Sequence, residues 1–254
     1  MRRPLLTTVA ILGLSCALLS CSKSIPKTSP TPVTPVGSSS SQAIETKEQL
    51  ESKANKGDTE AQFELGAMYH DGQAVPKDFA MAKKWFEKAA AKGEVKSEFN
   101  LGVMYYTGEG LTQDFMKAKN WFEKAAAQGN ARAEFNLGVM EYRGEGIKQD
   151  YAKAYTLFRQ AAEQNFGEAQ FNLGIMYAKG EGVVPDGIQS YAWFELARRQ
   201  GNPKAEEALK SLEPQMKLEQ IDQAKKIADG YAHKFAEMIA AAKASSSSSS
   251  SASR

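Results

Sequence analysis

Apolar residues along the middle of the chain recur at helical spacing, and polar residues separate them. Between 114 and 128 they occupy i, i+3, i+4, i+7 and i+8, the face of one amphipathic helix: Ala118, Trp121, Phe122, Ala125 and Ala126. Asp114 precedes this stripe, where a carboxylate can accept hydrogen bonds from the free N–H groups of a helix start. Gly129 follows it, where a left-handed residue ends many helices. The pattern predicts a helix across this segment.

A second apolar pattern at helical spacing covers 131–143 and predicts another helix. Its members are Ala133, Leu137, Met140 and Glu141, and the last position is tyrosine in the other units. Gly138 lies inside this helix, where glycine costs about 1 kcal/mol relative to alanine. Because the same glycine recurs in four units, we expect a packing reason. The neighbouring helix should approach closely there through its alanine-rich stripe.

The two helices form a unit of 36 residues that returns four times without slippage. A Leu-Gly pair in the first helix and a Trp-Phe or Leu-Phe pair in the second helix recur at this interval, with a loop glycine and an aspartate between them. A repeat of this length indicates a solenoid, in which each unit buries its apolar face against its neighbours. We predict an all-α chain, an α/α solenoid of four helix-turn-helix repeats: 58–93, 94–129, 130–165 and 166–201.

Two recurring polar features have structural explanations. The loop between the helices reads Gly-Glu-Gly in three units, and paired glycines suit positive φ in a tight turn. A phosphate-binding loop would need a preceding strand and a following Lys-Ser or Lys-Thr. The recurring aspartates each suit one helix N-cap, so cation binding is not needed to explain them: Asp78, Asp114, Asp150 and Asp186.

The segments on either side of the repeats predict capping helices. Residues 43–57 match the register of a second helix and predict an N-terminal cap. After residue 201 the repeat decays, and 202–243 predicts C-terminal capping helices, the last starting at Pro214. Its apolar stripe is Ile221, Ala224, Ala228, Tyr231, Phe235, Met238 and Ala242. A partner-binding or membrane-surface helix at 215–243 is the alternative, and the serine-rich tail 244–254 is expected to be disordered.

The N-terminal segment predicts export. Residues 1–20 join Arg2 and Arg3 to an apolar stretch too short for a membrane-spanning helix, which is typical of a signal peptide. The sequence Leu-Leu-Ser-Cys ending at Cys21 resembles a bacterial lipobox, which implies lipidation of Cys21; an ordinary signal peptide cut elsewhere is the alternative. Ser22 after the cysteine resembles outer-membrane lipoproteins. Residues 21–42 are rich in serine, proline and threonine and predict a tether.

The charge balance argues against nucleic acid as a partner. The chain carries 32 basic and 30 acidic residues, and removal of Arg2 and Arg3 with the leader leaves 30 of each. A nucleic-acid surface needs a basic excess. The two histidines, His70 and His233, lack a metal-type spacing, so we expect no cofactor, no metal and no enzymatic activity. His70 is expected to line the surface or a groove.

The repeat resembles a known family. The pattern A-x-F-N-L-G-x-M-Y…G-x-G-V…D…K-A…W-F-x-K-A-A-x-x-G is similar to the Sel-one-like repeat, a relative of the tetratricopeptide repeat. Ala61, Ala133 and Ala169 open the pattern, and Ser97 replaces the alanine in the second unit. The resemblance implies a right-handed α/α superhelix whose concave surface binds other proteins, as a scaffold or adaptor.

One side of the first helices faces the concave groove in tetratricopeptide-like solenoids and provides the candidate binding residues. We expect a phenylalanine ladder on this side to be buried between units: Phe63, Phe99, Phe135 and Phe171. Polar, aromatic and basic residues near it are expected to be partly exposed and to bind a protein or peptide: Asn100, Tyr106, Arg132, Asn136, Tyr142 and Arg143.

The sequence thus predicts a lipid-anchored protein of the bacterial envelope, at the outer membrane, that binds proteins and performs no chemistry. The first alternative is a cell-wall or host-surface binding protein. The second is a cell-wall-active or penicillin-binding hydrolase, because a cysteine-rich branch of the family is associated with that activity. That branch carries a cysteine pair in each repeat, whereas the repeats of this chain contain no cysteine.

Overall fold

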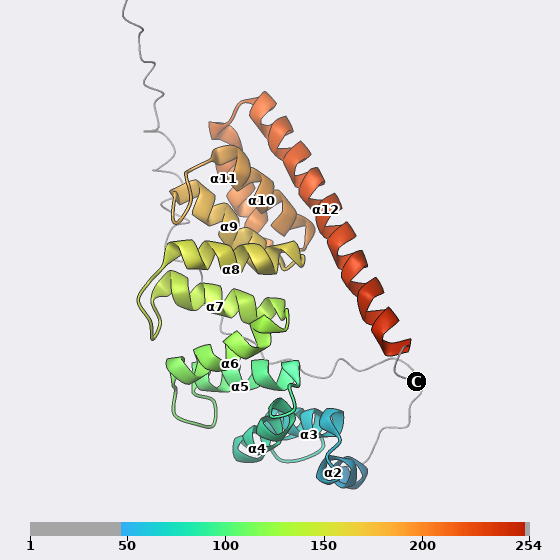
Figure 1. Ribbon diagram of the computed structural model, residues 1–254. Helices are drawn as coiled ribbons and strands as arrows, with labels where there is room; N and C mark the ends of the chain where they lie inside the picture. Colours follow the sequence, from blue (N-terminus) through green and yellow to red (C-terminus); the bar gives the residue numbers. More distant parts are fainter. Residues whose placement is uncertain (1–46, 252–254) are drawn as a thin grey trace, which may run out of the picture. The chain divides into compact units, whose positions relative to one another are not determined.

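The computed structural model describes residues 47–251, with side chains described to residue 244 (Figure 1). All regular secondary structure in this range is helical: eleven α-helices, α2–α12, and one short 3-10 helix. The predicted signal peptide, Cys21 and the tether lie outside the described residues. The described chain forms two compact units, 47–161 and 162–251. Each is taken by itself below.

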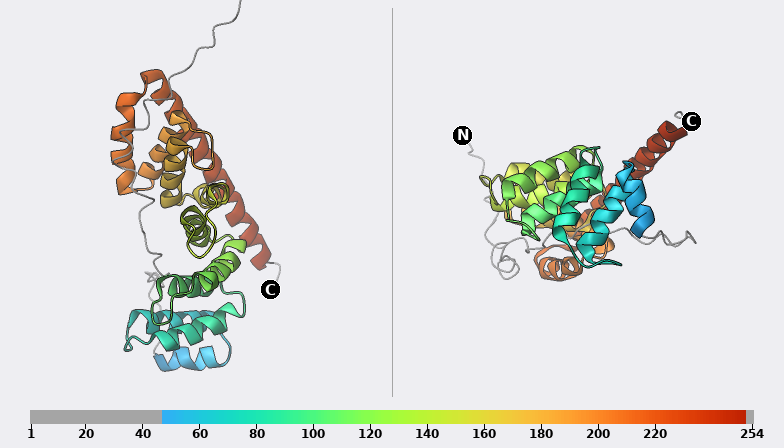
Figure 2. Two further views of the ribbon diagram at one scale, coloured as in Figure 1. Left: turned by 90° about the vertical axis from the view of Figure 1, so that its left-hand side faces the viewer. Right: turned by 90° about the horizontal axis from the view of Figure 1, so that it is seen from below.

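Residues 47–161 hold the N-terminal helix and the first repeats. In chain order the helices are α2 (Lys47–Asn55), α3 (Thr59–Asp71), α4 (Phe79–Ala90), α5 (Val95–Thr107), α6 (Phe115–Ala127), α7 (Ala131–Arg143) and most of α8 (Tyr151–Glu163). In Figures 1 and 2, α3 lies beside α4 and α5 beside α6, so each repeat is a helix-turn-helix pair. α2 packs on α3 through buried Leu50 and Ala54, as a capping helix would.

Residues 162–251 hold the fourth repeat and the C-terminal helices. These are α9 (Gly167–Lys179), α10 (Gly187–Arg199), α11 (Pro203–Leu212), a 3-10 helix η1 (Glu213–Gln215) and α12 (Leu218–Ser251). α10 lies between α9, α11 and α12. Four members of the predicted apolar stripe of α12 are buried: Ile221, Ala224, Ala228 and Phe235. In Figure 1 the C-terminal half of α12 extends beyond α9–α11, and Met238 there is 43% exposed.

The last helix differs from the prediction at both ends. It begins at Leu218, because 213–215, which includes Pro214, forms a separate 3-10 turn. It also continues through Ser251, where a disordered tail was expected, and only 252–254 lie outside the described residues. A formed helix adds one backbone hydrogen bond for each residue it gains, so the long helix before the serines favours their addition.

The predicted helix ends are confirmed. The four recurring aspartates each accept a 3.0 Å hydrogen bond at Oδ1 from the backbone N–H three residues on: Asp78, Asp114, Asp150 and Asp186. After each second helix the chain turns through a positive φ, at Gly93, Gly129, Asn165 and Gly201, with values of 81°, 77°, 61° and 80°. Glycine and asparagine adopt this conformation most readily. These ends therefore set the length of every second helix.

The glycine inside each first helix makes room for one aromatic ring. A Cβ added to Gly66, Gly102, Gly138 or Gly174 would lie only 2.5–2.7 Å from a ring carbon of the second helix in the same repeat. The rings are Phe86, Phe122, Phe158 and Phe194. The predicted close approach is confirmed, but a phenylalanine ring fills the space instead of the alanine stripe. Any larger residue would push the two helices apart.

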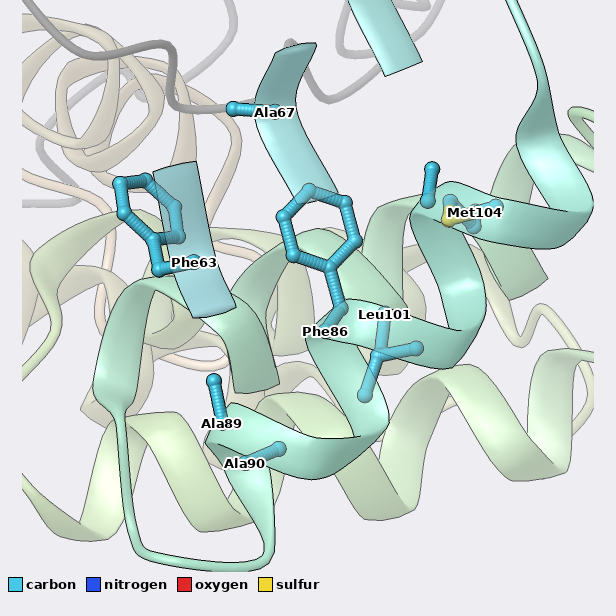
Figure 3. Packing of buried hydrophobic residues seen from close by; sticks show 8 residues of the cluster. Phe63, Ala67, Phe86, Ala89, Ala90, Leu101 and Met104 are labelled. Atoms are coloured by element: carbon cyan, nitrogen blue, oxygen red, sulfur yellow. The ribbon is translucent and has the colours of Figure 1, made fainter. Parts of the chain in front are cut away.

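The buried phenylalanines of the first helices complete this contact. Figure 3 shows the first repeat, where Phe63 and Phe86 lie in one cluster with Ala67 and with Leu101 and Met104 of the second repeat. The two rings are 6.1 Å apart. The equivalent pairs in the other repeats are separated by 5.3–5.7 Å. The predicted burial of the phenylalanine ladder is confirmed, because its members are 0–7% exposed.

Two alanine substitutions separate this packing from helix propensity. Gly102→Ala should lower the free energy of unfolding by about 1–3 kcal/mol, because its methyl group would overlap the Phe122 ring. Gly230→Ala should raise it by up to about 1 kcal/mol, since nothing lies within 4 Å of a Cβ at that helical position. Chemical denaturation of both variants measures the difference. Equal stabilisation by both would show that the ring is not a constraint.

Candidate functional site

A glutamate in the Gly-Glu-Gly loop links the second and the third repeat to the one before it. Tyr106, near the end of α5, donates a 2.5 Å hydrogen bond to Glu145 Oε2 in the next repeat. His70 takes the same place in the first repeat, and its Nε2 lies 3.4 Å from Glu109 Oε2. His70 is only 4% exposed, so its expected position on the surface or in a groove is wrong. These side chains join consecutive repeats.

The second glycine of the same loop allows a close backbone approach. Gly110 and Gly146 have φ values of 72° and 71°. A Cβ at these positions would lie 2.0 Å from Phe79 Cβ and 2.4 Å from Phe115 Cβ, at the start of the preceding second helix. The loop therefore rests on the previous repeat through its glycine and is held by its glutamate.

Three of the six predicted groove residues are buried, so the expected partial exposure is wrong for them. Asn100 is 1% exposed, and Asn136 and Tyr142 are each 5% exposed. For Asn100 the cause is the packing of successive first helices. Phe99 and Val103 of α5 share one apolar cluster with residues of α7, which closes the face that was expected to be open. Side chains so covered cannot meet a partner without rearrangement.

The other three predicted residues differ in their surroundings. Tyr106 and Arg143 are half-buried, and both reach Glu145, with Arg143 Nη1 3.3 Å from Glu145 Oε1. Burial, followed by the hydrogen bond to Glu145, raises the pKa of the Tyr106 hydroxyl, so it remains a donor at neutral pH. Arg132, at the start of α7, is exposed. A binding role for these six residues stays a prediction, and Arg132 is the best placed.

A buried polar side chain recurs at one position of the first helices, and the sequence pattern did not predict its burial. Gln62 and Gln170 donate from Nε2 to the carbonyl oxygens of Ala54 and Ala162 at 2.9 Å and 3.2 Å. Glu98 and Glu134 replace glutamine in the second and third repeats and are 5% and 7% exposed. An ionised carboxylate cannot donate such a bond. Burial raises the pKa of Glu98, although its carboxylate accepts a 2.8 Å hydrogen bond from Gln128 Nε2.

The residue before the packing phenylalanine is tryptophan in three repeats, and its exposure differs from one repeat to the next. Trp85 is 5% exposed, covered by α2, and Trp193 is fully buried beneath α12. Trp121 is half-buried, and Lys124 Nζ lies 4.0 Å from its ring centroid. Sequence reasoning placed Trp121 on the buried stripe. The exposed Asn120 and Lys124 beside it were the signal of a partly open position.

Two other kinds of feature are absent from the described residues. Within 47–251, the helices include none with the length and apolar character needed to cross a bilayer. The same part of the chain contains no group of three or more histidine, cysteine, aspartate or glutamate side chains arranged to hold a metal ion.

Comparison with known proteins gives one family and several related folds. A family model described as the Sel1 repeat matches residues 59–94, 95–130, 131–166 and 167–202, more than half of the chain. No curated protein matches the chain. The crystal structure of a Sel1 repeat protein from Oxalobacter formigenes is 31% identical, with a TM-score of 0.60, and the match covers 64% of this chain and 67% of that one.

A second solved structure is that of a protective antigen present in uropathogenic Escherichia coli strains and displaying an SLR fold. It is 29% identical to this chain, with a TM-score of 0.52. The match covers 75% of this chain but only 49% of that protein, so the chain corresponds to about half of its length.

Removal of one hydroxyl tests the contact between repeats. Tyr106→Phe should lower the free energy of unfolding by about 1–2 kcal/mol, because Glu145 loses a hydrogen bond that is partly shielded from water. In a Glu145→Ala background the same substitution should have little effect. Equilibrium denaturation of the two single variants and the double variant measures the coupling. Additive effects would contradict the contact.

A second substitution tests the buried glutamate. The folded-state pKa of Glu98 is raised, so its contribution to stability is present below the ordinary glutamate pKa of about 4.3 and is lost as pH rises through the folded value. Glu98→Gln should therefore stabilise the protein at pH 7 by roughly 1 kcal/mol and by less at pH 4. Denaturation curves at both pH values measure this. A gain independent of pH would exclude ionisation as its cause.

Proposed function

The chain belongs to the Sel1 repeat family. We propose that it is a membrane-anchored scaffold that binds other proteins in the bacterial envelope. Sel1 repeat proteins generally mediate protein–protein interactions and are generally scaffolds, not enzymes. The observation that carries the proposal is the regular array of four 36-residue repeats. Stacked repeats of this kind present extended surfaces that suit protein partners.

The positions of the polar side chains in the described repeats support this role. The side chains with the most evident chemistry, His70 and Tyr106, contact loop glutamates and stabilise the junctions between repeats. The exposed residues of the second helices and Arg132 remain on the surface. A scaffold needs this combination of a stiff interior and a polar exterior that a partner can contact.

The N-terminal sequence supports membrane anchoring. The lipobox-like sequence ending at Cys21 follows the two arginines and the apolar stretch of residues 1–20. A diacylglycerol on the cysteine and an acyl chain on its amine would supply more than the two lipid signals that stable anchoring requires. Ser22 at the next position fits the outer membrane as the destination. The serine- and proline-rich residues 22–42 would then separate the repeats from the bilayer.

A second candidate is a cell-wall or host-surface binding protein. The likeness to the protective antigen of uropathogenic strains, at 29% identity, favours it. This candidate shares the anchor and the repeats with the scaffold but differs in the partner, which would be a glycan or a host-cell component. Co-sedimentation with peptidoglycan and binding to host cells would distinguish it from the scaffold.

Cross-linking in cells tests the scaffold. A photo-reactive amino acid at Arg132, which is exposed, should give discrete adducts with one or a few envelope proteins. The same group at Tyr142, which is 5% exposed, is the buried control and should give none. Mass spectrometry identifies the adducts. Absence of protein adducts from Arg132 and from the exposed positions of α6, with sedimentation on peptidoglycan, would favour the second candidate.

One substitution tests the anchor. Cys21→Ala should abolish incorporation of labelled palmitate and move the protein from the membrane fraction to the soluble fraction, because no other residue of the predicted processing site carries a thiol. Cys16→Ala is the matched control and should leave both unchanged. Membrane retention of the Cys21→Ala protein would contradict lipidation at this residue.

A further inference from the structure

The fourth repeat shows what can cover the outer tryptophan of a second helix. Trp193 of α10 is stacked against Tyr231 and Phe235 of α12, with ring centroids 4.8 Å and 6.1 Å away and interplanar angles of 23° and 22°. The Tyr231 hydroxyl donates to Gln189 Oε1 at 3.1 Å. An amphipathic helix with two aromatic side chains one turn apart thus binds this position within the chain itself.

The second repeat presents the same position without this cover. Trp121 lies two repeats before Trp193, and the residues that correspond to Gln189 and Leu196 are Lys117 and Lys124. Leu196 is 1% exposed, whereas both lysines are exposed and Trp121 is half-buried. The outer face of α6 therefore keeps the aromatic element of the α10 site and places two lysines beside it, with one acidic residue, Glu123, in the same lining.

The face of α6 around Trp121 is hollowed. The hollow is lined by Lys117, Asn120, Trp121, Glu123, Lys124 and Ala127. Met116, one turn before Asn120, is 52% exposed, although it is a large apolar side chain. Flexible methionines and half-exposed aromatics are common where a protein binds a helix.

The other repeats do not offer this surface. In the first repeat Trp85 is covered by Leu50 and Ala54 of α2. In the third repeat Leu157 replaces tryptophan, and in the fourth the position is filled by α12. The face of α6 is thus the repeat surface that combines a half-buried tryptophan with two exposed lysines.

We propose that the outer face of α6 around Trp121 binds an amphipathic helix of another protein, one with aromatic side chains one turn apart and acidic side chains beside them. The aromatic requirement follows from the rings on Trp193. The acidic requirement follows from Lys117 and Lys124, which stand where the internal site has neutral side chains, so a carboxylate complements them. This inference rests on the scaffold function and names the chemistry of one partner.

A peptide derived from α12 provides the probe. The sequence of residues 218–243, labelled with a fluorophore and carrying Lys225→Glu and Lys234→Glu, has the aromatic pair and an acidic flank. It should bind the full chain saturably, with an affinity that falls as salt rises. The same acidic peptide with Tyr231→Ala and Phe235→Ala should bind at least about 10-fold more weakly, the loss expected of an aromatic hot spot.

Matched variants of the full chain assign the site. Trp121→Leu copies the residue of the third repeat, so it keeps apolar packing and should weaken the acidic peptide at least about 10-fold. Lys117→Glu with Lys124→Glu should weaken it similarly and remove the salt dependence. Lys153→Glu changes the exposed lysine at the same position of the third repeat and should have no effect. Circular dichroism verifies that each variant keeps its helicity.

Three results would overturn the proposal. These are an absence of saturable binding, unchanged affinity of the Trp121→Leu protein, and equal loss from Lys153→Glu. Binding of the unmodified 218–243 peptide as tightly as the acidic one would also overturn it, since the face would then suit a second copy of this chain. Protein adducts from Arg132 in cells, without peptide binding at α6, would retain the scaffold function and remove only this site.

Discussion

The contact between one phenylalanine ring and one glycine determines the geometry of every repeat. The second helix brings its ring so close to the first that a Cβ on the glycine would lie 2.5–2.7 Å away. The unfavourable glycine is retained because the two helix axes can then approach. Once this distance is set, the residue before the phenylalanine lies about 100° around the second helix from the ring. The core contact thereby places the tryptophans.

The repeats are joined by a different set of groups. The Gly-Glu-Gly loop carries a glutamate that binds a side chain of the preceding repeat and a glycine that allows the loop to rest on the preceding second helix. These contacts use the aromatic residues that the sequence suggested for a groove. Because these side chains hold the repeats together, binding falls to other, exposed groups, such as Arg132 and the outer face of α6.

The internal pairing of α12 with α10 connects stability with recognition. A capping helix has to cover the apolar face of the last repeat, and here it does so with two rings stacked on Trp193. The same chemistry serves a partner helix wherever another repeat leaves its tryptophan partly open. Replacement of Gln189 and Leu196 by lysine at the equivalent positions of α6 changes the preferred partner from a neutral helix to an acidic one.

The helix class, the register of the four repeats and the existence of a close contact at each glycine could be predicted from the sequence. These features depend on residues near one another in the chain, so spacing and residue type are sufficient to predict them. Sequence reasoning also favoured burial of the phenylalanine ladder, which the structure confirms.

Which polar side chains are exposed depends on the packing of the helices. Asn100 lies on a helix face that is open in an isolated pair but closed by the next repeat, and Asn136 and Tyr142 are buried as well. Likewise, Trp121 is half-exposed, whereas α2 covers Trp85 and α12 covers Trp193 at the equivalent positions of the first and fourth repeats. Helical periodicity describes a face, whereas exposure depends on what packs against that face, and residues distant in the sequence supply that packing.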